Sequence, residues 1–167
     1  MRKLYKNLQD LLEQKIKLYE IFIQLLNEEW KCVSQYFYDD LQNIIVKKDD
    51  QVMQMQALEN SRSSLMKKIA GDLKMEPSGL TLKKLIQLKN NPYRENLSNC
   101  RKILLSNIQK INILSSKIKN FMDGSALSLK KSIAFIHSEG EKANSPYKAN
   151  GQVLEGKLQS RMLSVDA

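Results

Sequence analysis

The stretch LEQKIKLYEIFIQLLNEEWKCVSQYF, residues 12–37, decides the fold class. Its large apolar residues recur in alternating steps of four and three, which places them on one face of an α-helix. A strand cannot use this spacing, because its side chains repeat every two residues. The stretch therefore predicts a long amphipathic helix over about residues 3–37. The residues that set the rhythm are Leu12, Ile16, Tyr19, Ile23, Leu26, Trp30, Val33 and Phe37.

The same rhythm continues beyond Asp39-Asp40, an acidic pair that can cap a new helix or mark a bend in the same one. It predicts a second long helix over about residues 40–74. Glu76-Pro77-Ser78-Gly79 is the first strong break, because proline lacks a backbone donor and glycine tolerates a positive φ. The apolar residues of this second helix are Leu41, Ile44, Met55, Leu58, Leu65 and Ile69.

Short capping motifs predict where the remaining helices begin and end. Thr81 is placed to cap a short helix over about 81–89, and Asn91-Pro92 to open a third long helix over about 92–122. Asp123-Gly124-Ser125 predicts the end of that helix and the cap of another over about 126–138. The sequence thus predicts an all-α fold, an antiparallel bundle of long amphipathic helices with coiled-coil-like packing. This single helical domain spans 1–138 and a flexible C-terminal tail spans 139–167.

Composition supports one helical domain. The chain has 167 residues, of which 42% are hydrophobic and only 7% aromatic, with six Gly and three Pro. It is too apolar for a disordered chain and too poor in turn residues for a many-stranded β fold. No apolar run approaches the roughly 18 residues of a membrane span, and the charged N-terminus lacks the apolar stretch of a signal peptide. We therefore expect a cytoplasmic protein without membrane insertion, whose Cys32 and Cys100 are ordinary buried or half-buried thiols.

The net charge of +9 is concentrated in one part of the chain. Residues 1–80 hold twelve basic and twelve acidic residues, whereas residues 81–138 hold eleven basic and two acidic ones. This asymmetry could indicate an acidic protein partner or a nucleic acid. Aromatic side chains that could stack on bases are almost missing from the third long helix, which carries only Tyr93 and Phe121, so a solvated basic face is favoured over a nucleic-acid footprint.

Candidates for catalysis are few. His137 is the only histidine, which excludes any site that needs two imidazoles. Asp39-Asp40 and Asp49-Asp50 are adjacent pairs on helices, where neighbouring side chains diverge by about 100° and do not converge on one metal. The sequence has no Gly-rich phosphate loop, nucleophile elbow or Cys-x-x-Cys motif. It predicts no enzyme, no cofactor, no metal site and no small-molecule substrate.

The C-terminal helices carry more Leu and Ile than one seam requires, and surplus apolar surface on a helix often marks a partner site. Residues such as Ile103, Leu105 and Leu129 lie beside the main apolar stripe. We therefore expect a surface for a partner helix in this half of the chain. The candidate contacts are Leu104, Ile108, Ile111, Ile118, Met122, Leu127, Ile133 and Ile136.

The order of these features resembles the FlgN family of flagellar type III export chaperones. Leu80-Thr81-Leu82-Lys83-Lys84-Leu85-Ile86 is similar to the short connecting helix of the family, and Ala57-Leu58-Glu59-Asn60-Ser61-Arg62 to its Leu-Glu-x-x-Arg spacing. The tail is the most specific part. Pro146-Tyr147-Lys148-Ala149-Asn150-Gly151, followed by Ser160-Arg161, matches the family's Tyr-x-x-x-Gly then Ser-Arg arrangement, with Asn150 where many relatives carry Asp.

The resemblance implies a cytoplasmic chaperone that holds the hook–filament junction (hook-associated) proteins by their C-terminal helical region. It would prevent premature assembly and deliver them to the export gate. It implies cargo contacts at Ile108, Ile111, Ile118, Ile133 and Ile136, and an export-gate contact at Tyr147. The alternative from the residues alone is a structural coiled-coil or nucleic-acid-associated basic helical protein. Homodimerisation through the first two helices stays open.

Overall fold

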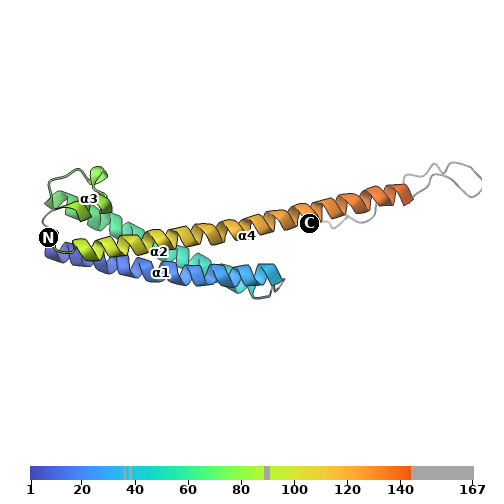
Figure 1. Ribbon diagram of the computed structural model, residues 1–167, viewed down its shortest axis with the longest axis horizontal. Helices are drawn as coiled ribbons and strands as arrows, with labels where there is room; N and C mark the ends of the chain where they lie inside the picture. Colours follow the sequence, from blue (N-terminus) through green and yellow to red (C-terminus); the bar gives the residue numbers. More distant parts are fainter. Residues whose placement is uncertain (36, 38, 89–90, 144–167) are drawn as a thin grey trace, which may run out of the picture. The chain divides into compact units, whose positions relative to one another are not determined.

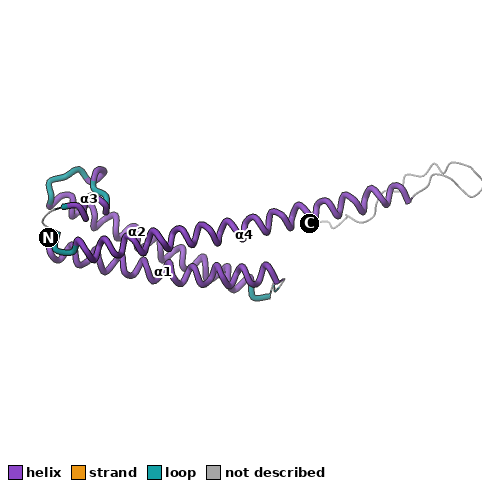
Figure 2. Tube along the Cα trace, viewed as in Figure 1, coloured by secondary structure: helices purple, strands orange, loops and turns teal. Residues whose placement is uncertain are grey.

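The computed structural model describes residues 1–35, 37, 39–88 and 91–143, and these residues form helices and no strand (Figures 1 and 2). The helices are α1 (Arg2–Gln35), α2 (Leu41–Asp72), α3 (Leu82–Gln87) and α4 (Arg94–Ala143), and Pro77–Gly79 forms a 3-10 turn, η1. The prediction of an all-α fold built on long helices that pack against each other is confirmed.

The chain divides into two compact units, Met1–Met122 and Asp123–Ala167. The first unit holds α1, α2, η1, α3 and the first part of α4, and the described part of the second unit is the rest of α4. The expected tail over 139–167 is helical as far as Ala143, and its remainder, with Tyr147, lies outside the described residues. The division into a domain over 1–138 and a tail stays a prediction.

Ion pairs and ring contacts give the direction of the helices in the first unit. Lys15 of α1 pairs with Glu59 of α2. Glu29, which comes later in α1, pairs with Lys48, which comes earlier in α2, so α1 and α2 are antiparallel. Tyr5 stacks on Tyr93 and Trp30 contacts Phe121, so α4 runs parallel to α1. Figure 1 shows both α1 and α4 starting at the end where α2 stops and α3 lies.

The main core lies at that end of the first unit. It joins residues from α1, α2, α3 and the start of α4, so the short α3 covers the end of the three long helices. Burial of each such Leu or Ile stabilises the fold by about 1.5–3 kcal/mol. The buried residues of this cluster are Tyr5, Leu8, Leu12, Leu65, Met66, Ile69, Ala70, Leu80, Leu85, Leu97, Cys100 and Leu104.

The α1 stripe is buried largely as predicted, with one exception at its end. Leu12, Leu26 and Val33 are buried, and Trp30 is half-buried. Phe37 lies beyond the last residue of α1, Gln35, and 62% of its surface is exposed. The helix ends two residues earlier than expected, so Phe37 does not join the buried face of α1 that its spacing predicts.

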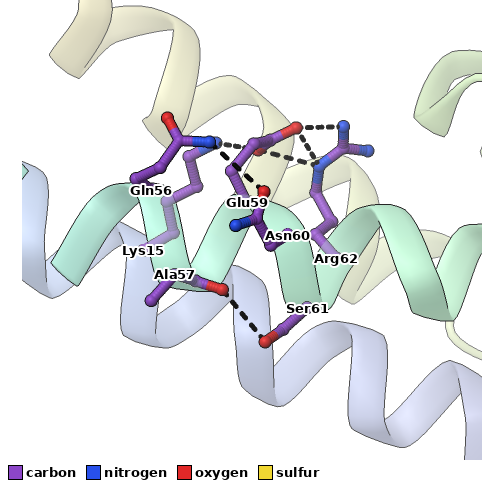
Figure 3. A network of polar contacts seen from close by, with 7 residues as sticks. All are labelled: Lys15, Gln56, Ala57, Glu59, Asn60, Ser61 and Arg62. Atoms are coloured by element: carbon purple, nitrogen blue, oxygen red, sulfur yellow. Dashed lines mark hydrogen bonds and ion pairs between the residues drawn. The ribbon is translucent and has the colours of Figure 1, made fainter. Parts of the chain in front are cut away.

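A polar cluster occupies the middle of the hairpin between α1 and α2 (Figure 3). Glu59 accepts hydrogen bonds from Arg62 Nε at 3.1 Å and from Lys15 Nζ at 2.6 Å. The hydrogen bond from Arg62 is the main reason why the pKa of Glu59 is lowered from 4.5 to about 2. Burial acts in the opposite direction, and Lys15 adds to the lowering.

Removing the Glu59 charge is expected to reduce stability at neutral pH and to flatten its loss in acid. Because the pKa of Glu59 is lower in the folded state, its contribution is present above pH 4.5 and is lost as the pH falls toward about 2. Glu59→Gln should lower the free energy of unfolding by up to about 1 kcal/mol, the upper range for a partly exposed ion pair. Urea unfolding of both proteins from neutral pH to about pH 3 checks this. Parallel pH profiles would contradict it.

The predicted caps are partly confirmed. The Thr81 side chain accepts a hydrogen bond from Lys84 N, and Asn91 Oδ1 accepts one from Tyr93 N at 2.9 Å just before α4 begins. Asp40 occupies the N-cap position of α2 but makes no side-chain cap hydrogen bond. The break before α3 is also present, although α2 ends before Pro77, at Asp72. Lys74, with a φ of 55°, turns the chain there.

The predicted helix break at Asp123-Gly124-Ser125 is wrong, because α4 is a single helix from Arg94 to Ala143. Glycine inside a helix costs only about 1 kcal/mol relative to alanine, and no proline is present to remove a hydrogen bond. The apolar residues before and after Gly124 keep a helical period, so the local signals for a cap do not outweigh helix continuation.

Candidate functional site

The first part of α4 carries a seam of residues spaced three and four apart. Leu97, Cys100, Leu104 and Ile118 are buried in this seam. Asn107 is also buried there, and its Nδ2 has no hydrogen-bond partner among the described residues. The seam therefore packs into the first unit, although its middle is less apolar than its ends. Its residues are Leu97, Cys100, Leu104, Asn107, Ile111, Leu114, Ile118 and Phe121.

Contacts with α1 hold this part of α4 along its length. Asn96 Nδ2 donates a hydrogen bond to Gln9 Oε1 at 3.1 Å. Further along, the rings of Trp30 and Phe121 meet edge to face with their centroids 5.5 Å apart. Lys117 Nζ lies 3.8 Å from the centroid of the Trp30 ring, a cation–π contact. One lysine of the basic face thus stabilises the packing of α4 on α1.

The part of α4 in the second unit carries another apolar stripe, and its large residues are exposed. Ala126, Leu129, Ile133 and Ile136 are spaced three, four and three apart, and we call them the distal stripe. At 3.6 residues per turn they fall within an arc of about 80°. Leu129 is 63% exposed, Ile133 45% and Ile136 61%. Such a row of exposed Leu and Ile side chains fits the apolar face of another helix.

The structure separates the predicted contact residues into two groups. Leu104 and Ile118 are buried in the first unit and Ile111 is half-buried, so these side chains stabilise the bundle. The other five are exposed, but they do not share one face. Ile133 and Ile136 belong to the distal stripe, whereas Leu127 lies on another side of α4. The exposed group is Ile108, Met122, Leu127, Ile133 and Ile136.

The sequence reasoning left Leu129 outside the candidate contacts, although it lies centrally in the distal stripe. The signal that could have found it is the three-to-four spacing with Ile133 and Ile136. All three residues lie within the short helix predicted over about 126–138, so this spacing is visible in the sequence.

The described residues offer no arrangement suited to metal binding, since no group of three or more His, Cys, Asp or Glu side chains comes together among them. His137 is exposed on α4. Cys32 and Cys100 are buried free thiols, as predicted. Burial is the main cause that raises the pKa of Cys100, and the Glu13 carboxylate adds to the rise, so its thiolate form is disfavoured. What the surface of α4 does present is a set of exposed Leu and Ile side chains.

The comparison with known families decides what kind of protein carries this surface. The family described as "FlgN protein" matches residues 1–155. The chain belongs to the FlgN family. This is the family of flagellar export chaperones, and the resemblance noted in the sequence is therefore confirmed. Comparison with curated proteins and with solved structures gave no match.

The match with FlgN covers the whole first unit and residues 123–155 of the second, including the distal stripe. Membership supports a role as a flagellar export chaperone. The FlgN family is not known for enzymatic activity. Within the part of the FlgN-family chain that the structure describes, each helix is either too short or too polar to span a bilayer.

Proposed function

We propose that this FlgN-family chain is a cytoplasmic chaperone that binds the C-terminal helical region of flagellar hook–filament junction proteins. It prevents their premature assembly and delivers them to the type III export gate. The observation that carries the proposal is the distal stripe of α4, where Leu129, Ile133 and Ile136 are exposed in a helical row. Membership of the FlgN family supports the export role.

The physical basis is the covering of one apolar helix face by another. A cargo helix that later assembles outside the cell has an apolar face, and packing it against the distal stripe removes both faces from water. Each Leu or Ile buried in this way contributes about 1.5–3 kcal/mol. Ordering and association costs reduce the net affinity. The complex stays reversible, as delivery requires.

The distal stripe also gains from a partner. Most of the stability of a helix in a protein comes from packing of its apolar face, not from the propensity of its residues. Gly124 lies near the start of this segment and lowers its helix propensity further. A cargo helix laid along Leu129, Ile133 and Ile136 would supply the missing packing.

Export-gate binding rests on the sequence resemblance. Tyr147 lies in the tail motif that matches the family's Tyr-x-x-x-Gly, and it falls outside the described residues. We propose that this segment contacts the gate while α4 holds the cargo. The two tasks then use separate residues.

The test is binding of purified chain to junction proteins with and without their C-terminal helical region, followed by calorimetry. We expect binding only when that region is present. Binding to a DNA duplex or single strand at about 150 mM salt, with a steep salt dependence, would instead favour the nucleic-acid alternative. Absence of any junction-protein binding would refute the proposed cargo.

A further inference from the structure

The solvent face of α2 carries a second exposed apolar surface, within the first unit and separate from the distal stripe. Val46, Val52 and Met53 are 52%, 50% and 70% exposed, and Ile45 is 38% exposed. Asp49 and Asp50 are exposed among them. We call the six residues the acidic α2 patch: Ile45, Val46, Asp49, Asp50, Val52 and Met53.

The patch has no counterpart on α1, the helix that pairs with α2. Ile21 is the only large apolar residue among the exposed positions between the two ends of α1. Helix propensity does not explain the patch, because β-branched residues such as Val46 and Val52 are poorer helix formers than the Ala, Glu or Lys that exposed positions favour. Packing does not explain it either, since α2 turns Ile44, Leu65 and Ile69 inward instead. Exposed apolar patches of this kind mark interaction surfaces.

The charge of the patch is opposite to that of the protein. The net charge of the chain is +9, yet the charged residues of the patch are two aspartates. The two neighbouring lysines turn toward α1. Lys48 pairs with Glu29, and Lys47 lines a cavity of about 320 Å³ with residues of both helices. No ion pair among the described residues involves Asp49 or Asp50.

We propose that the acidic α2 patch docks an amphipathic helix of another protein whose apolar stripe is flanked by Lys or Arg. Ile45 and Val52 form one row and Val46 and Met53 another, each with a seven-residue spacing of about 10 Å along α2. Side-chain rows of a partner helix fit between such rows. Asp50 lies at the edge of these rows and Asp49 between them, so Lys or Arg beside the partner's stripe would meet Asp50 directly and reach Asp49 with their long side chains. The soft Met53 side chain adapts to the apolar contact.

The charge separates this partner from the other candidates. A second copy that used the same patch in a two-fold arrangement would bring its own Asp49 and Asp50 against these aspartates. A helix that binds the distal stripe meets Lys130 beside it, so a partner for that stripe is favoured if it carries the opposite charge. The two surfaces thus select different helices, and the docking at α2 does not depend on the proposed function.

The test uses two synthetic helical peptides, both with Leu at the a and d positions of a heptad. One carries Lys at e and g, and the other carries Glu there. Calorimetry with the full chain should show at least tenfold tighter binding of the Lys peptide, and Asp49→Lys/Asp50→Lys should reverse this preference. Val46→Ser/Met53→Ser should weaken the Lys peptide at least tenfold, whereas the control Asn43→Ser/Gln54→Ser, on exposed positions beside the patch, should not.

Amide chemical shifts of the wild-type chain then locate the bound peptide. Shifts centred on residues 42–56 support the proposal. Shifts confined to residues 122–137, or equal affinity for both peptides, would overturn it. A wild-type dimer by light scattering that becomes monomeric in Asp49→Lys/Asp50→Lys would also overturn it, since a second copy would then be the occupant.

Discussion

Replacing Ile133 and Ile136 together with aspartate is expected to weaken binding of a junction-protein C-terminal helix at least a hundredfold. Both side chains are exposed, and with Leu129 they form the large apolar part of the distal stripe. Losing burial of two isoleucines removes about 3–6 kcal/mol of interaction, and every 1.4 kcal/mol is a factor of ten. The new carboxylates would also be desolvated in the interface. Calorimetry with the isolated cargo region measures the change.

The matched control places two carboxylates elsewhere on the same segment. Ser128→Asp/Ala134→Asp adds the same charge to exposed positions about 120° from the centre of the distal stripe. Its cargo affinity should stay within a few fold of the wild type. Both variants should keep their far-ultraviolet circular dichroism, because none of these four side chains is buried. Equal loss in the two variants would show that charge on the segment, and not the stripe, governs binding.

Aspartate at Ile118 is expected to have a different effect, a loss of at least about 3 kcal/mol in the free energy of unfolding. Ile118 is only 5% exposed, in the seam that packs α4 into the first unit. Truncating a buried isoleucine alone costs about 2–5 kcal/mol, and burying an unpaired carboxylate adds to this. Position on the helix seam, and not residue type, determines the outcome.

Ile113 provides the matched comparison, since it is the same residue on the same helix and is 60% exposed. Ile113→Asp should change the free energy of unfolding by no more than about 0.5 kcal/mol, as surface substitutions usually do. Urea unfolding followed by circular dichroism distinguishes the two variants. Similar stability of Ile118→Asp and Ile113→Asp would mean that the buried seam does not hold α4 in solution.

The sequence predicts the helices better than it predicts their exposure. The spacing in residues 12–37 is long and regular enough to identify α1, and the side chains of Thr81 and Asn91 make the hydrogen bonds expected of caps. Periodicity identifies the apolar face of a helix, but it does not say whether another helix covers that face. Ile118 and Ile133 each have an apolar residue four positions before and three positions after, yet Ile118 is buried and Ile133 is exposed.

The other differences have local causes. Asp123-Gly124-Ser125 has the composition of a helix end, but neither glycine nor a capping residue forces one without a steric break such as proline. The sequence pattern does not reveal the acidic α2 patch, because Val46, Val52 and Met53 lie close in sequence to the apolar residues that form the buried face of α2. Only the position of α1 shows which side of α2 faces solvent.

The ring of Trp30 lies between α1 and α4, in contact with Phe121 and Lys117. Since the chain has no other tryptophan, its fluorescence emission reports on this single junction. Lifting of α4 from α1 would expose the indole to water and shift the emission to longer wavelength, whereas a ligand held entirely by residues 126–136 would leave it unchanged. The fluorescence of Trp30 therefore distinguishes ligand binding at the distal stripe from separation of α4 from α1.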